Sequence, residues 1–328
     1  MMKINLTKKR KNLLILIAGN VLLMVGLSIV SPTFFTYGNI SSVMARMSVY
    51  GMLGIALTIV FISGGFDLTI GAVMALSGAL TGTLYALGLP FYLVIIIALS
   101  SGIVVGIINA YFIADLKLSP FIVTLATMSI IQSIVYAILQ GKVITTLPRG
   151  FLDLGYVYLF KMPLLFVVLL ITAFLSFVML EKSVIGRQVF AVGGNVRTAY
   201  ISGINIREIQ YFVYAISGLI SAVAGLMFTI RIGAVIPDAG VNAPLEIVTA
   251  VLIGGTTIYG GKGSISGSLL GVLSMYLLLN GFSLLGLNPF WEVIIFGIIL
   301  IVIVGQDKIF SSLKKIVFPV KVSEKTST

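Results

Sequence analysis

The chain has 328 residues, of which 59% are hydrophobic and 9% charged, and its mean hydropathy is +1.17. These values are outside the range of soluble globular domains and indicate a membrane protein. The chain contains no cysteine and no histidine, which excludes disulfides, thiolate nucleophiles, Cys/His metal sites, haem ligation and Ser-His or Cys-His catalysis. The formal charge of +11 is compatible with a nucleic-acid partner or with basic loops beside a membrane.

Apolar stretches of about 20 residues, the length that spans a bilayer core, recur along the whole chain. They predict an all-α fold, a polytopic transmembrane helical bundle of about ten helices. In chain order the predicted helices cover 13–31, 40–62, 67–88, 91–113, 119–140, 163–181, 208–229, 245–258, 264–285 and 289–305. The first follows the basic sequence KKRK and lacks a small-residue cleavage site, so we interpret it as an uncleaved anchor.

These helices define one transmembrane domain, 13–305, between a basic N-terminal segment, 1–12, and a basic tail, 306–328. With ten crossings and a cytoplasmic N-terminus, both termini and 16 of the 21 basic residues lie on the cytoplasmic side. The other five belong to the outer side or to the membrane: Arg46, Lys142, Arg149, Lys161 and Arg231. This asymmetry follows the positive-inside rule. We therefore expect a multi-pass protein of the cytoplasmic (inner) cell membrane without a nucleic-acid partner.

The two halves of the chain contain similar sequences. LKLSPF at 116–121 matches LGLNPF at 285–290, and the stretch that starts with Asp67 resembles the stretch that starts with Glu246. In the predicted topology Asp67 begins its helix from the cytoplasmic side, whereas Glu246 begins its helix from the outer side. The halves are therefore expected to form an inverted repeat, as in many transporters.

Asp67 is the acid of a Gly-rich sequence, SGGFDLTIG at 63–71. A carboxylate at a helix N-terminus accepts hydrogen bonds from free backbone N–H groups, so we first interpret Asp67 as a helix cap. The alternative roles for Asp67 are gating or contact with a partner, and ion coupling deeper in the membrane. A second Gly-rich sequence, IGGTTIYGGKG at 253–263, falls on the same side as the first. An inverted repeat does not allow that pairing, so we interpret the similarity of the two sequences as coincidental.

The polar connection 182–207 is too long for a simple link, since connections between helices need only a few residues. It is basic and rich in glycine. It predicts a turn at Gly193, Gly194 and Asn195, followed by a short helix that ends at Gly203. Such a projection suggests a docking surface for a cytoplasmic partner, with an ordinary connecting loop as the alternative.

Five motifs make the chain similar to a known family over residues 60–304, approximately. They are SGGFDLTIGAVMAL (63–76), LSPFIVTLATM (118–128), IGRQVFAVGGNVRTAYISGI (185–204), IGGTTIYGGKGSISGSLLG (253–271) and NGFSLLG (280–286). The chain resembles the permease subunit of bacterial ATP-binding-cassette (ABC) importers for monosaccharides, the ribose, xylose, galactose and autoinducer-2 group.

The resemblance implies a complex of two permeases, identical or related, with two ABC ATPase subunits and a periplasmic or lipid-anchored sugar-binding protein. It implies a non-catalytic chain without a cofactor of its own, because the partner subunit binds ATP. It also implies that the inner loop carries a coupling helix that docks on the ATPase. By position this helix maps to residues 197–199, although the glutamate of the family motif is absent. The ATPase-coupling residues are then Arg187, Gly193, Gly194, Asn195, Arg197, Thr198, Ala199 and Gly203.

By the same analogy the helix 119–140 lines the translocation pathway. One face of this helix carries residues at a spacing of four: Thr124, Met128, Gln132, Tyr136 and Gln140. Neutral hydrogen-bonding groups and an aromatic edge suit a neutral, hydroxylated substrate, but such groups also join transmembrane helices to one another. Three residues near helix ends, Asp67, Glu246 and Trp291, are candidates for gating.

The predicted function is therefore the import of a monosaccharide such as ribose, driven by a separate ATPase. The sequence IYGGKGS resembles a phosphate loop, but Thr256 occupies the first glycine position and Gly263 the hydroxyl position, so we do not expect ATP binding. The alternative is a secondary transporter or a channel for a small polar solute, which inverted repeats also permit. That alternative requires charged groups at mid-depth, whereas Asp67, Glu246 and Glu292 are predicted near helix ends.

Overall fold

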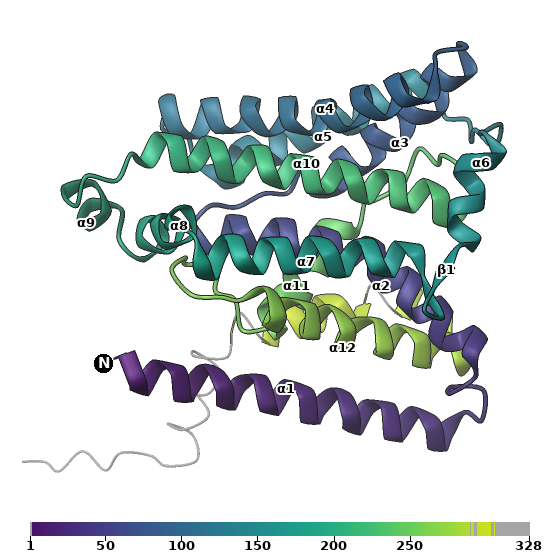
Figure 1. Cartoon of the computed structure of the whole chain (residues 1–328), viewed down its shortest axis with the longest axis horizontal. Helices are drawn as coiled ribbons and strands as arrows, with labels where there is room; N and C mark the ends of the chain where they lie inside the picture. Colours follow the sequence, from purple (N-terminus) through teal and green to yellow (C-terminus); the bar gives the residue numbers. More distant parts are fainter. Residues whose placement is uncertain (1, 289, 292–293, 303–304, 306–328) are drawn as a thin grey trace, which may run out of the picture.

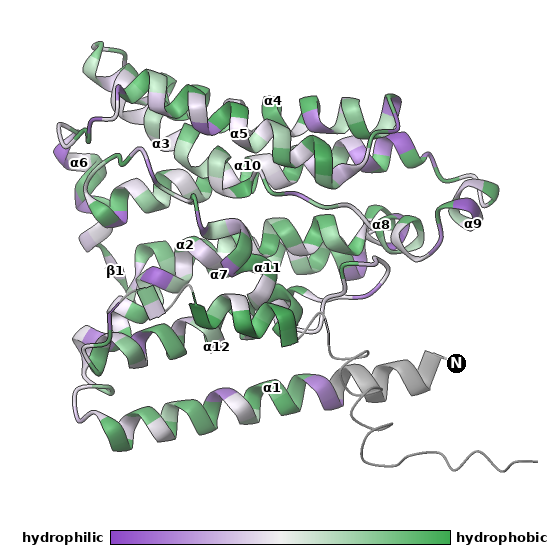
Figure 2. Cartoon of the chain, turned by 180° about the vertical axis from the view of Figure 1, so that it is seen from behind, coloured by the Kyte–Doolittle hydropathy of each residue, from purple (hydrophilic) through white to green (hydrophobic). Residues whose placement is uncertain are grey.

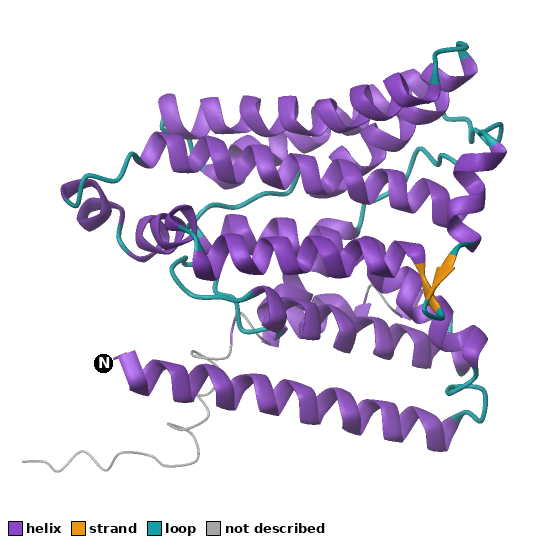
Figure 3. Ribbon diagram, in the orientation of Figure 1, coloured by secondary structure: helices purple, strands orange, loops and turns teal. Residues whose placement is uncertain are grey.

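The computed structural model describes residues 2–288, 290–291, 294–302 and 305. This part of the protein is a bundle of helices that run along one common direction (Figure 1). Its strands are two residues each, β1 (Tyr158–Leu159) and β2 (Met162–Pro163), and they form a small antiparallel hairpin (Figure 3). The prediction of an all-α, polytopic helical bundle is confirmed.

Seven helices of the described part are long and apolar enough to cross a membrane. They are α1 (Met2–Val30), α2 (Tyr37–Ile62), α4 (Phe91–Ala110) with its π-helical end η1 (Tyr111–Asp115), α5 (Pro120–Leu139), α7 (Leu164–Lys182), α10 (Ile206–Ile232) and α12 (Ile265–Leu284). Hydrophobic residues cover most of the length of these helices (Figure 2). The chain is thus a multi-pass membrane protein. Of the tenth predicted helix, 289–305, the described residues are helical, and the tail 306–328 lies outside the described residues.

Two further apolar helices, α3 (Ile70–Ala86) and α11 (Ala243–Ile253), are shorter than the seven spanning helices. Each was expected to make a full crossing, at 67–88 and at 245–258. The physical reason for the difference is glycine. Gly88 ends α3 with a φ of 83° and Gly255 ends α11 with a φ of 82°, a conformation that interrupts a right-handed helix.

The starts of the two short helices meet inside the bundle. A Cβ atom added to Gly71, at the start of α3, would lie 2.2 Å from the carbonyl oxygen of Gly240 and 3.2 Å from Cδ of Pro244, at the start of α11. Two longer helices pack against the opposite half of the chain: α10, from the second half, packs against α3 and α4, while α2, from the first half, packs against α11 and α12. This packing is what two interlocked repeats would produce; the inverted repeat stays a prediction.

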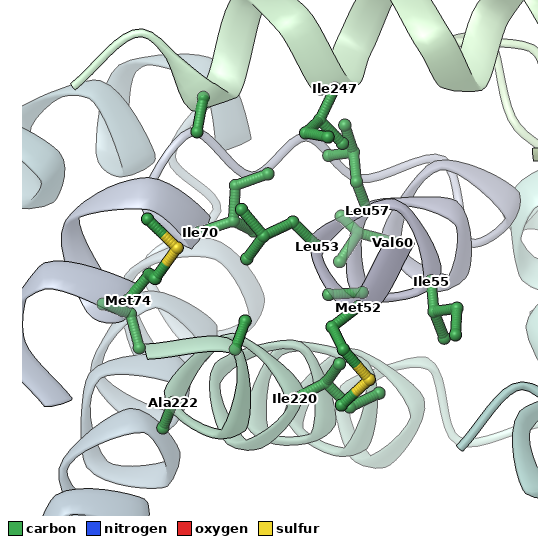
Figure 4. Packing of buried hydrophobic residues seen from close by; sticks show 14 of the residues in the cluster. Met52, Leu53, Ile55, Leu57, Val60, Ile70, Met74, Ile220, Ala222 and Ile247 are labelled. Atoms are coloured by element: carbon green, nitrogen blue, oxygen red, sulfur yellow. The ribbon is translucent and has the colours of Figure 1, made fainter. Parts of the chain in front are cut away.

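The core of the bundle lies where α2, α3, α10 and α11 meet (Figure 4). Buried side chains of all four helices contribute to it: Met52, Leu53, Leu57 and Val60 of α2, Ile70 and Met74 of α3, Ile220 and Ala222 of α10, and Ile247 of α11. Because lipid chains are as apolar as these side chains, helix association in a membrane depends on close packing rather than on removal from water. Glycines provide that closeness between α4 and α10, where a Cβ on Gly102 would lie 2.2 Å from the carbonyl oxygen of Gly218.

The bundle has two distinct ends (Figure 1). The start of α1, the segment 183–205 and the loop 254–264 lie at one end, which we call the loop end. The β1–β2 hairpin, α6 (Arg149–Leu152) and the 3₁₀ turn η2 (Asp153–Tyr156) lie at the other, which we call the hairpin end. The sidedness predicted from lysine and arginine assigns the loop end to the cytoplasmic side; that assignment stays a prediction.

Candidate coupling and translocation sites

The predicted docking segment contains two helices, α8 (Val184–Gly194) and α9 (Val196–Ile201). The break between them falls at Asn195, which has an extended backbone and whose Oδ1 accepts a hydrogen bond from the backbone N of Thr198 at 2.9 Å. Asn195 therefore caps α9. Gly193 and Gly194 were expected in a turn; instead they are the last two residues of α8.

Gly203 ends α9, as predicted. Its φ is 79°, and its backbone N donates to the carbonyl oxygen of Tyr200 at 3.0 Å. The N of Ile204 donates to the carbonyl oxygen of Ala199 at 3.1 Å. This pair of bonds around a left-handed glycine is a common way to satisfy the last carbonyls of a helix.

The helix α9 projects from the loop end of the bundle (Figures 1 and 2). Tyr200 and Ile201 are 71% and 76% exposed, and Arg197 and Thr198 beside them are also exposed. Ala199 points inward and is 3% exposed. Apolar side chains exposed beside polar ones are typical of a protein interaction site, so the geometry of α9 fits a docking helix.

Three Gly-rich sequences meet beneath α8, and we call this contact of Gly64, Gly193, Gly260 and Gly261 the glycine junction. A Cβ on Gly193 would lie 1.8 Å from the carbonyl oxygen of Ile62 and 2.7 Å from the N of Gly261. A Cβ on Gly260 would lie 2.8 Å from Cα of Gly64. The N of Gly261 also donates to the carbonyl oxygen of Ile62 at 2.9 Å. α8 therefore rests directly on the end of α2 and on the loop after α11.

Both Gly-rich sequences whose similarity was interpreted as coincidental contact α8 at the glycine junction. A Cβ on Gly260 or Gly261 would lie 2.5–2.8 Å from backbone atoms of Gly193 or Gly194, whereas a Cβ on Gly64 would lie 3.5 Å from Cα of Gly193, an ordinary contact. Arg187 of α8 lies near this contact, since Arg187, Glu181 and Lys262 border a cavity of about 670 Å³ at the loop end.

A charged contact joins the start of α10, which follows α9, to the end of α4. Arg207 Nε lies 2.7 Å from Asp115 Oδ1, and the hydroxyl of Tyr211 donates to Asp115 Oδ2 at 2.6 Å. The guanidinium of Arg207 also lies over the Tyr211 ring, 5.6 Å from its centroid. Sequence reasoning missed Asp115 and Tyr211, because nothing local in the sequence pairs residues that are 96 positions apart.

Asp67 lies in the link between α2 and α3 and is 2% exposed. Its Oδ1 accepts from the backbone N of Thr69 at 2.8 Å and from the Thr69 hydroxyl at 2.5 Å, and its Oδ2 accepts from the hydroxyl of Ser217 in α10 at 2.8 Å. Asn109 Nδ2 of α4 donates to the same Thr69 hydroxyl at 3.2 Å. Because α3 begins at Ile70, Asp67 is not the N-cap that the sequence suggests. It forms a local turn and bonds the link to α10.

The other two predicted helix-end residues lie apart from Asp67 in the sequence and in their contacts. Glu246 is in the first turn of α11, where a negative charge is favourable, and its Oε2 accepts from the hydroxyl of Tyr276 in α12 at 3.2 Å. Trp291 is exposed, and its N donates to the carbonyl oxygen of Asn288. Glu292 lies outside the described residues.

The four predicted pathway residues of α5 divide into two pairs. Thr124 is fully buried and its hydroxyl donates to the carbonyl oxygen of Pro120 in the same helix at 2.8 Å. Met128 is partly buried against the core. In this conformation these two residues have packing roles.

Gln132 and Tyr136 reach out of α5 to the link between α10 and α11. Gln132 Nε2 donates to the carbonyl oxygen of Pro237 at 2.8 Å, and the Tyr136 hydroxyl donates to Asp238 Oδ1. The same link pairs with the segment after α5, since the N of Val235 donates to the carbonyl oxygen of Ile144 at 2.8 Å. Two of the predicted pathway residues thus hold the link that leads into the short helix α11.

Comparison with known proteins places the chain among transport permeases. The model of a family described as "branched-chain amino acid transport system / permease component" matches residues 39–304. No solved structure matches the chain.

Curated relatives cover most of the chain. The chain is 34% identical to the ribose import permease protein RbsC of Haemophilus influenzae over 301 residues, which are 90% of this chain and 92% of the relative. It is 35% identical to RbsC of Bacillus subtilis over 292 residues, 88% of this chain and 91% of the relative. It is 32% identical to the fructose import permease protein FrcC of Rhizobium meliloti over 293 residues, 85% of this chain and 80% of the relative.

The glycine junction predicts that alanine lowers the stability of the fold at Gly193 but not at the adjacent Gly194. Gly193→Ala is expected to lower the free energy of unfolding by about 1–3 kcal/mol, because the added methyl group meets backbone atoms that cannot rotate away. Gly194→Ala is the matched control, since no atom lies within 4 Å of its added Cβ. Thermal unfolding of both variants in the same detergent makes the comparison, and equal midpoints would contradict the junction.

Asp67 predicts a difference between two replacements. Asp67→Asn keeps an acceptor for Thr69, and the Ser217 hydroxyl can rotate to accept, so near-wild-type folding and most of the transport activity are expected. Asp67→Leu leaves buried donors without an acceptor, at a cost of about 1–3 kcal/mol for each. Thermal unfolding and uptake assays separate the two effects. A well-folded but inactive Asp67→Asn variant would show instead that the charge itself is needed.

Proposed function

The chain belongs to the branched-chain amino acid transport system / permease component family, and from this membership we propose that it is the permease subunit of an ABC importer for a monosaccharide. The relatives that support the cargo class are named as import permeases for ribose and fructose and as a transport permease for L-arabinose. A ribose-like sugar is the first candidate. A secondary transporter or channel is not favoured by these relatives.

The observation that carries the proposal is a series of contacts that connects α9, through its neighbours α8 and α10, to the link before the short helix α3. α8, which precedes α9, rests on the end of α2 through the glycine junction, and α2 leads through the Asp67 link into α3. α10, which follows α9, is bonded at its start to Asp115 of η1 and at Ser217 to Asp67. A force applied to α9 therefore reaches the centre of the bundle through backbone contacts and hydrogen bonds.

In the proposed mechanism an ABC ATPase subunit docks on α9 and moves it when ATP binds and is hydrolysed. ATP stays on that partner, and this chain acts without a cofactor of its own. The bundle alternates between outward and inward openings, a change that the partner can drive because it binds the two states differently. The coupling residues of the inner loop divide in role: Arg197, Thr198 and the exposed apolar residues of α9 offer contacts, while Gly193, Asn195 and Gly203 set the shape.

Gln132 and Tyr136 are placed to act as a gate in this mechanism. Both hold the α10–α11 link against α5, so the bonds must break if α5 and α11 separate. Neutral groups of this kind can also pair with sugar hydroxyls once they are released from the link. Thr124 and Met128 support the same helix from within the core.

The proposed assembly follows from the two ends of the bundle. The loop end faces the cytoplasm, where both termini are also proposed to lie, and receives one of the two ATPase subunits of the complex. The hairpin end faces outward and receives a periplasmic or lipid-anchored sugar-binding protein. A second permease, a copy of this chain or a related one, completes the pathway in the cytoplasmic membrane.

The docking role of α9 is tested by Ile201→Glu. A charge at this exposed apolar position should reduce co-purification of the ATPase with the permease, and ATP-dependent ribose uptake, by at least about tenfold, since a buried unpaired charge at an interface is costly. Phe160→Glu, at a residue 93% exposed at the hairpin end, is the control and should leave co-purification unchanged. Normal co-purification and uptake with Ile201→Glu would overturn the assignment of α9.

Sidedness is tested by labelling introduced cysteines, which the native chain does not contain. A membrane-impermeant maleimide should label Tyr200→Cys in inside-out vesicles and Phe160→Cys in intact spheroplasts. The reverse pattern would place α9 on the outer surface, where no cytoplasmic ATPase could reach it.

A further inference from the structure

Two arginines have no part in the proposed coupling or gating. Arg46 lies about two and a half turns inside α2, and Arg231 lies in the last turn of α10. Both belong to the few basic residues that the charge asymmetry leaves off the cytoplasmic side. Ionisable residues within membrane-spanning helices are rare and are functional candidates by default.

The fold brings these arginines together, although 185 positions separate them in the sequence. They border a cavity of about 150 Å³ towards the hairpin end, between α2, α10 and α12. We call it the arginine cavity, and its lining includes Tyr276 and the polar residues Asn39, Ser42, Arg46, Arg231, Asn280 and Ser283. Ser42 and Ser283 are exposed and mark its opening.

The wall of the arginine cavity is fixed by hydrogen bonds. Asn280 Nδ2 donates to Asn39 Oδ1 at 2.7 Å, and Asn39 Nδ2 donates to Asn280 Oδ1 at 3.1 Å. Asn39 Nδ2 also donates to the carbonyl oxygen of Phe34 at 2.8 Å. The reciprocal amide pair bonds α2 to α12 beside the arginines, so the cavity has a defined shape in the absence of a ligand.

The charges around the arginine cavity do not balance. The guanidinium of Arg46 lies 6.0 Å from the ring centroid of Tyr276, and the Tyr276 hydroxyl donates to Glu246. Among the residues that the structure describes, two guanidinium groups thus share this region with one carboxylate, which leaves one surplus positive charge in that set. Each guanidinium carries five N–H donors, and Glu246 offers acceptors for few of them.

We propose that the arginine cavity binds a phosphate group, either free phosphate or the headgroup phosphate of an anionic lipid. Guanidinium groups match phosphate oxygens in pairs, and the hydroxyls of Ser42 and Ser283 add donors at the opening. The cavity is smaller than the roughly 300–1,000 Å³ of pockets for drug-sized molecules, so a compact group fits. The neutral sugar proposed as cargo carries no charge that would compensate the two arginines, whereas a phosphate group does.

The test uses the full-length chain, stripped of lipid in an uncharged detergent, with inorganic phosphate as the probe. Phosphate added at constant ionic strength should raise the thermal midpoint of the wild type by several degrees. Arg46→Gln and Arg231→Gln should lose that rise, and Arg149→Gln, which removes an arginine of the hairpin end outside the cavity, should retain it. Because phosphate stabilises proteins generally through exclusion from their surface, the measured quantity is the rise in the wild type beyond the rise in the cavity variants.

A second arm separates the two sources of the phosphate group. In nanodiscs that contain phosphatidylglycerol, native mass spectrometry should detect retained lipid in the wild type and Arg149→Gln but not in Arg231→Gln if a headgroup fills the cavity. A phosphate-induced rise that persists in those nanodiscs identifies free phosphate instead. If Arg231→Gln does not fold, Arg46→Gln serves in both arms. Equal responses of the wild type and both cavity variants to phosphate, with equal lipid retention, would overturn the proposal.

Discussion

The structure depends on backbone contacts that only glycine permits. In a membrane the surrounding lipid removes the hydrophobic incentive for helices to associate, so they must gain dispersion energy and satisfy polar groups by very close approach. The α4–α10 contact and the glycine junction both meet this condition, with added Cβ atoms overlapping backbone oxygens on the opposing segment. A contact between backbones has little freedom to adjust. Motion at α8 must therefore move the end of α2 as well, and this stiffness is what coupling over a distance requires.

The two short helices are the complementary feature, because they place irregular backbone inside the bundle. Non-helical segments at membrane depth persist only when protein groups satisfy their polar atoms. The link before α3 meets this requirement with Asp67, Thr69 and Ser217, and the Tyr214 hydroxyl adds a bond to the carbonyl oxygen of Phe66 at 3.1 Å. The link before α11 is bonded by Gln132 and Tyr136. The first set is buried within the bundle, and the second involves residues on the open face of α5. The second link is therefore the easier of the two to release.

Much of this arrangement could be predicted from the sequence, and the failures share a physical cause. Hydropathy identified the spanning helices, because it depends on the composition of continuous segments. The end of α9 at Gly203 was predictable, since a left-handed cap is a local event. The role of Gly193 and the bond between Asp67 and Ser217 were not, because each joins segments far apart in the sequence: Gly193 meets Ile62 and Gly261, and Ser217 lies 150 positions after Asp67. Asp115 and Tyr211 gave no signal at all, since an acid and a tyrosine at the end of a helix are ordinary there.

The basic residues at the two ends of the bundle have different surroundings. At the loop end, positive charge is abundant and stays near water, where it costs little and is available to a partner. Towards the hairpin end, Arg46 and Arg231 are drawn into the bundle between α2, α10 and α12, where a charge needs compensation. α2, in the first half of the chain, packs against α11 and α12 of the second half, and α10, in the second half, packs against α3 and α4 of the first half. In the proposed mechanism α9 acts on these helices from the loop end, and a group bound in the arginine cavity would contact the same α2 and α10 near the hairpin end.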